Sequence, residues 1–106
     1  YMYNMLKDPK QVAWAESVDV IFPDQAGNGT HMNISGMAMS RYAARPENAL
    51  RLLEFLSGAK AQEMYSEING EYPVQPGVEL SEQLKMWGDF KRDDVSLTAV
   101  AANRGA

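Results

Sequence analysis

Apolar residues recur at helical spacing in the middle of the chain. Between Pro46 and Leu56 they follow one another at intervals of three and four, with charged side chains on the opposite face, which predicts an amphipathic helix. Ser57 and the glycine after it interrupt this pattern, and Ser57 is placed to cap a second helix from Ala59 to Asn69. Two consecutive helices separated by a short break predict a helical hairpin.

Three further helices are predicted from capping residues and shorter apolar patterns. An aspartate followed by a proline is typical of a helix start, and it predicts a short helix over residues 10–16. Similar patterns predict helices over residues 81–87 and 93–103, and we expect Asp93 or Asp94 to cap the second of these.

Strand patterns are fewer than helical ones. The stretch Val18–Pro23 is rich in β-branched and aromatic residues, and the stretch His31–Met39 alternates in part, so both are predicted as strands. Residues 24–30 between them are turn formers and predict a loop. Two or three strands make a thin sheet for this many helices. The pattern therefore predicts an α/β or α+β chain, rich in helices and short of strands for a sheet of its own.

Composition narrows the class of protein. Hydrophobic residues make up 45% and charged residues 23% of the 106 residues, which is typical of a folded globular chain. The net charge of −4 and the lack of a basic cluster argue against nucleic acid and anionic membranes as partners. The chain has no cysteine, which excludes disulfides and thiolate metal sites, and no apolar run approaches the roughly 18 residues of a membrane-spanning helix.

Two sets of side chains could carry chemistry. Asp19, His31 and Ser35 are the residue types of a hydrolytic triad, but Ser35 does not lie in a G-x-S-x-G turn, and local bonding to the backbone is the favoured interpretation. Tyr1 and Tyr3 offer phenolate oxygens, which are hard donors suited to a hard cation such as Fe³⁺. Composition alone favours the alternative that these tyrosines are core or interface residues.

Several segments, taken in order, carry a resemblance to a known family: Y-M-Y-N-M-L-K-D-P at 1–9, N-I-S-G at 33–36, N-A-L-R-L-L-E-F-L at 48–56 and E-Y-P-V at 71–74. The chain resembles the C-terminal third of bacterial periplasmic ferric-iron-binding proteins of the FbpA/FutA type, the substrate-binding components of iron(III) ABC transporters.

The resemblance implies an α/β fragment of a two-lobed type II periplasmic-binding fold, helix-rich with few strands. We expect residues 1–32 to belong to the C-terminal lobe. Residues 33–70, with the helical hairpin, would belong to the N-terminal lobe, and residues 71–106 would return to the C-terminal lobe with the terminal helices.

The same resemblance implies a periplasmic protein that captures ferric iron between its lobes and delivers it to a membrane permease, rather than an enzyme. It places Tyr1 on the second residue of the family's tyrosine pair and ranks Tyr3 second as a metal ligand. The other ligands, and an exogenous anion, would come from outside these 106 residues, so we expect the fragment alone to bind Fe³⁺ weakly or not at all. Alternative functions are a periplasmic binding protein for a sugar, polyamine or thiamine, and a small hydrolase.

Overall fold

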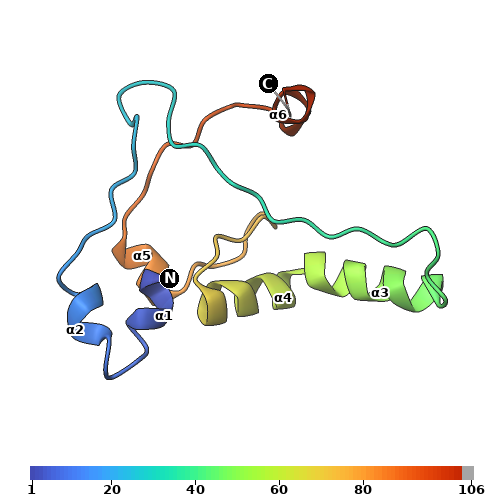
Figure 1. The fold of residues 1–106 in the computed structure, drawn as a ribbon, viewed down its shortest axis with the longest axis horizontal. Coiled ribbons are helices and arrows are strands. Elements are labelled where there is room, and N and C mark those ends of the chain that lie inside the picture. The colour runs from blue at the N-terminus through green and yellow to red at the C-terminus, as the bar shows by residue number, and fades with distance from the viewer. Residues whose placement is uncertain (104–106) are drawn as a thin grey trace. The chain divides into compact units, whose positions relative to one another are not determined.

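The computed structural model describes residues 1–103. Helices dominate it (Figure 1), and their bounds are α1 Met2–Met5, α2 Val12–Ala15, α3 Pro46–Ser57, α4 Ala59–Met64, the π-helix η1 Tyr65–Asn69, α5 Glu82–Met86 and α6 Leu97–Ala102. The chain divides into two compact units. Unit 1 comprises Tyr1–Asp19 and Gly36–Gly88, and unit 2 comprises Val20–Ser35 and the chain from Asp89 onward. The assignment of 1–32, 33–70 and 71–106 to two lobes stays a prediction.

The helix over α3 is confirmed, but the helical hairpin is not. Figure 1 shows α3 and α4 following one another end to end. Gly58 is the one residue between them, in extended backbone (φ −78°, ψ 161°), and a single residue is too short to reverse the chain into a hairpin. Gly58 is also the N-cap of α4, so the predicted cap at Ser57 is wrong. The Ser57 hydroxyl donates instead to the carbonyl of Leu53.

The helix predicted over Ala59–Asn69 forms along its whole length, but its second half is a π-helix instead of an α-helix. After Met64 the backbone widens into η1, and it stops at Gly70, whose φ of 68° is left-handed. Left-handed backbone is accessible to glycine at little cost, which is why a glycine ends this helix.

The C-terminal helices form as the sequence indicates, with one corrected cap. Ser81 accepts a hydrogen bond from the backbone N–H of Leu84 and so caps α5. The cap of α6 is Ser96, which accepts from the N–H of Ala99 at 3.1 Å. The predicted caps Asp93 and Asp94 lie before this helix.

The two predicted strands are not formed. Within residues 1–103 the only strand-like pairing is an isolated parallel bridge between Thr30 and Arg92. The stretches Val18–Pro23 and His31–Met39 are irregular backbone. Residues that favour strands become a strand only where a neighbouring backbone supplies a ladder of hydrogen bonds. In unit 2 that ladder consists of one bridge.

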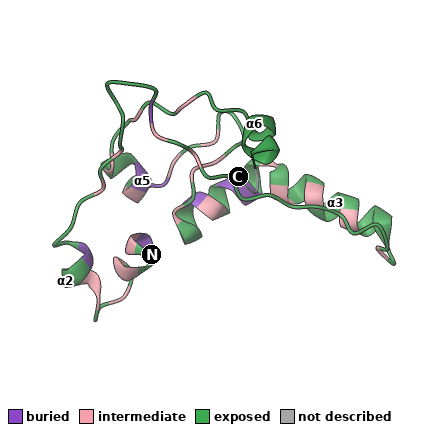
Figure 2. Ribbon diagram, turned by 45° about the horizontal axis from the view of Figure 1, so that its top comes forward, coloured by how far each residue is buried: buried purple, intermediate pink, exposed green. Residues whose placement is uncertain are grey.

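Burial is concentrated in unit 1. Its buried apolar residues are Tyr3, Ala15, Ala61 and Leu84, and Leu84 is completely inaccessible to solvent. By contrast, no residue of α3 is buried, and Figure 2 shows this helix almost entirely in the colours of exposed and intermediate residues. The contacts that order unit 1 therefore lie around α1, α2, α4, η1 and α5.

Candidate functional site

Tyr1 stands at the start of α1 and is fully exposed. Its carbonyl accepts hydrogen bonds from the N–H groups of Asn4 at 3.0 Å and Met5 at 3.1 Å, so its backbone belongs to the first turn of the helix. The helix thus fixes the position of the Tyr1 backbone while the phenol faces solvent. The oxygen of a phenol in this setting can bind a cation, with its proton released to water, without first breaking a packed core.

Tyr3, two residues further on, has the opposite environment. It is 5% exposed, its hydroxyl donates to the carbonyl of Glu67 at 2.6 Å, and its ring meets that of Trp87 edge to face at 6.3 Å. Residues two apart on a helix do not face one another. The structure therefore does not bring the phenols of Tyr1 and Tyr3 together, and it uses the Tyr3 hydroxyl as a hydrogen-bond donor.

Lys7 completes the contacts of Tyr3, and the sequence analysis missed it. Its ammonium lies 4.1 Å from the centroid of the Tyr3 ring and donates to the carbonyls of Glu67 at 2.6 Å and Ile68 at 3.2 Å. Tyr3 and Lys7 are four residues apart, a spacing at which side chains of one helical segment meet, so this neighbourhood could have been found from the sequence. Their shared contact with the Glu67 carbonyl could not have been found from the sequence, because Glu67 is 60 or more positions away.

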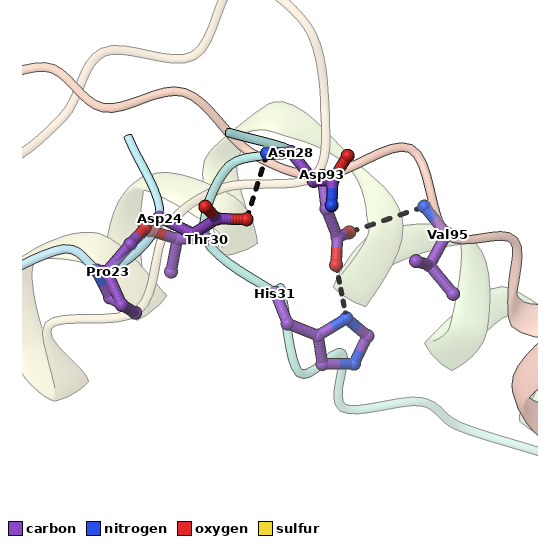
Figure 3. Close-up of polar contacts among 7 residues, drawn as sticks. All are labelled: Pro23, Asp24, Asn28, Thr30, His31, Asp93 and Val95. Atoms are coloured by element: carbon purple, nitrogen blue, oxygen red, sulfur yellow. Dashed lines mark hydrogen bonds and ion pairs between the residues drawn. The ribbon is translucent and has the colours of Figure 1, made fainter. Parts of the chain in front are cut away.

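Unit 2 contains a histidine–carboxylate pair (Figure 3). Nδ1 of His31 lies 2.7 Å from Oδ2 of Asp93, whose other oxygen accepts from the N–H of Val95 at 3.4 Å. The imidazole is about half exposed, whereas the Asp93 side chain is 11% exposed. The carboxylate partner of His31 is thus Asp93 and not Asp19, the residue considered for a hydrolytic triad.

Three further contacts join the two segments of unit 2, Val20–Ser35 and the chain from Asp89 onward. The side-chain amide of Gln25 accepts from the N–H of Lys91 at 2.6 Å and donates to its carbonyl at 3.0 Å. The Lys91 ammonium donates to the carbonyl of Gly27 at 2.6 Å, and the rings of Phe22 and Phe90 stack at 4.1 Å. Residues 24–30 are thus a loop, as predicted, and this loop is fastened to residues 90–93.

Two titratable groups of unit 1 have shifted pKa values. Burial raises the pKa of Tyr72, because a phenolate is poorly solvated there. The pKa of Lys85 is raised mainly by its hydrogen bond to Glu82, 2.8 Å away and three residues earlier on α5.

Over residues 1–103, no three His, Cys, Asp or Glu side chains are grouped so that they could hold a metal ion. Among the same residues, no helix is both long and apolar enough to cross a membrane.

Comparison with known families defines the class of protein. Residues 2–92 match the family described as bacterial extracellular solute-binding proteins, and the chain belongs to that family. The α/β, two-lobed type II periplasmic-binding fold expected from the resemblance is confirmed, and this chain is a helix-rich part of it.

Individual relatives are more specific. The chain is 43% identical over 99 residues to iron uptake protein A1 of Synechocystis sp., a match that covers 92% of this chain and 28% of that protein. It is 46% identical to the apo ferric ion-binding protein A of Pasteurella haemolytica, with a TM-score of 0.89 over 97% of this chain and 32% of that one. The chain is also 41% identical to the Trichodesmium IdiA (FutA) protein, which was solved with iron and citrate ligands. That match has a TM-score of 0.80 and covers 88% of this chain and 30% of the Trichodesmium protein. The chain therefore spans about a third of the length of these relatives.

Proposed function

We propose that these residues form the C-terminal third of a ferric-iron-binding protein, the substrate-binding component of an iron(III) ABC transporter. The observation that carries the proposal is the match to the ferric ion-binding protein A of Pasteurella haemolytica, at 46% identity and a TM-score of 0.89 along 97% of this chain. Identity at this level along almost the whole chain supports a shared ligand as well as a shared fold. The longer protein containing this chain is called the full-length protein below.

Within this proposal, Tyr1 is the iron ligand that the chain contributes. Its exposed phenol can ionise and offer a hard anionic oxygen to Fe³⁺. Tyr3 was predicted as a second ligand, but a ligating phenolate has no proton to donate, and the Tyr3 hydroxyl donates one to Glu67. We therefore propose Tyr1 as the ligand and give Tyr3 a different role.

The proposal extends to the partners and the compartment. Capture of ferric iron outside the cytoplasmic membrane, followed by delivery to a permease, is the role that fits an extracellular solute-binding family. An exogenous anion beside the metal is supported by the citrate bound with iron in the Trichodesmium relative. The relatives reported above are named for iron uptake or ferric-ion binding, which supports binding rather than catalysis and iron rather than a sugar, polyamine or thiamine.

Visible absorption of the iron-loaded full-length protein tests the proposal. A tyrosinate bound to Fe³⁺ gives a charge-transfer band, which we expect to lose part of its intensity in Tyr1→Phe, because the other tyrosine of the family's pair would remain as a ligand. Iron affinity, measured by competition with citrate, should fall by more than about 100-fold, because losing an outer-shell partner of a metal ligand already costs roughly 10–100-fold.

Tyr42→Phe is the matched control, since Tyr42 is another exposed tyrosine of unit 1. We expect it to keep both the band and the affinity. A band that survives unchanged in Tyr1→Phe would refute Tyr1 as ligand, and a full-length protein without any such band would refute tyrosinate ligation of iron.

A further inference from the structure

Two side chains join α1 (Met2–Met5) to a distant part of unit 1. They are Tyr3, on the helix, and Lys7, just after it, and both contact the end of η1. Tyr1 is the N-cap of the same helix, so these contacts bear on where its backbone lies.

Both side chains bind the same backbone oxygen. The carbonyl of Glu67 accepts from the Tyr3 hydroxyl at 2.6 Å and from the Lys7 ammonium at 2.6 Å, and the Ile68 carbonyl accepts from Lys7 at 3.2 Å. These carbonyls lie in the last turn of η1, where a helix leaves oxygens without partners in the helix and where a positive charge is favourable. Tyr3 and Lys7 therefore act as a cap supplied by a distant segment.

The η1 end also fits closely against Tyr3. A Cβ atom added to Gly70, the residue that ends η1, would lie 2.3 Å from Cγ of the Tyr3 ring. Only a residue without a side chain allows this approach. In addition, π-helical turns are rare and occur frequently at functional sites.

We propose that Tyr3 and Lys7 are positioning residues for iron binding: they fasten α1 to the end of η1 and so hold the Tyr1 phenol where it ligates the metal. This inference rests on the proposed function. Neither side chain touches the metal in this scheme. Lys7 is exposed and Tyr3 is buried, but they act on the same carbonyl, so losing either one should loosen the same attachment.

The test uses the iron-loaded full-length protein with Tyr3→Phe and Lys7→Met. Tyr3→Phe keeps the ring against Trp87 and removes only the hydroxyl, and Lys7→Met keeps most of the side-chain length and removes the ammonium. Each variant should bind Fe³⁺ about 10–100-fold more weakly, the range typical of outer-shell residues. Each should also shift the wavelength of the tyrosinate charge-transfer band, which depends on ligand geometry and which a loss of stability alone would not move.

Lys60→Met is the matched control, because Lys60 is also an exposed lysine of unit 1 and pairs only with Glu63 on its own helix, at 3.1 Å. We expect it to leave affinity and band unchanged. Lys7→Arg should restore both, since a guanidinium can donate to the same two carbonyls.

The outcomes separate this inference from the proposed function. Wild-type affinity and band position in both Tyr3→Phe and Lys7→Met, with the band still weakened in Tyr1→Phe, would refute the positioning role and leave the proposed function standing. A wild-type protein without the band would overturn both. Should Lys7→Met fail to fold, Tyr3→Phe still decides the question.

Discussion

Nδ1 of His31 lies 2.7 Å from Oδ2 of Asp93, and this contact joins two residues that are 62 positions apart in the chain. The contact links the two segments of unit 2, and its residues directly follow Thr30 and Arg92, which form an isolated parallel bridge. Because unit 2 has no buried apolar residue among those the structure describes, polar contacts such as this one carry much of its order.

We therefore predict that His31→Ala destabilises the full-length protein by about 1 kcal/mol, the typical net contribution of one hydrogen bond. Asp93→Asn should have a similar effect, and the double variant should cost less than the sum of the two, because the residues share one interaction. Urea unfolding of the four proteins measures this coupling. Strictly additive effects would show that the pair contributes nothing. Ser35→Ala serves as the control and is expected to change stability little.

Gly70 and Gly77 offer a matched test of the close approach to Tyr3. Both have left-handed backbone, with φ of 68° and 81°, but a Cβ at Gly70 would meet the Tyr3 ring whereas one at Gly77 would meet nothing within 4 Å. Gly77→Ala should cost about 1 kcal/mol from backbone strain alone. Gly70→Ala should cost roughly 2–4 kcal/mol, since overpacking is added to strain. Equal unfolding midpoints for the two variants would contradict the contact.

Ser66 is predicted to be a stabilising polar residue of the core. Its hydroxyl accepts from the N–H of Ser81 at 2.7 Å, and both residues are buried. Ser66→Ala leaves that N–H without an acceptor and should lower stability by about 1–3 kcal/mol. Ser57→Ala, an exposed serine whose hydroxyl also binds backbone, should cost less than about 0.5 kcal/mol. Thermal unfolding compares the two, and a similar effect of both would argue against the buried bond.

The raised pKa of Tyr72 predicts a loss of stability in alkali. Burial disfavours the phenolate in the folded protein, whereas in the unfolded chain Tyr72 ionises near its ordinary pKa of 10.0. Stability from this group is therefore complete below that pH, and it falls as the pH rises toward the folded pKa, because the unfolded state loses its proton first. Tyr72→Phe should reduce the difference between urea midpoints at about pH 8 and about pH 11, whereas Tyr42→Phe, at an exposed tyrosine, should not.

Helices were predictable because their signals are local. The residue patterns of 46–56 and 81–87 depend on neighbours within four positions, and α3 and α5 form where these patterns lie. The strands predicted at Val18–Pro23 and His31–Met39 failed for the opposite reason. A strand needs hydrogen bonds from a second segment, and no local pattern shows whether that segment is there.

The sequence by itself determined the positions of the main helices, since these follow from short-range spacing, and its resemblance to ferric-iron-binding proteins indicated the family and Tyr1 as a candidate ligand. Tertiary structure decided what the residues around Tyr1 do. Tyr3 is a hydrogen-bond donor in a packed core because its hydroxyl meets Glu67, 64 positions away. His31 pairs with Asp93 and not Asp19 because folding brings distant segments together, and contacts of that range leave no periodic trace in the sequence.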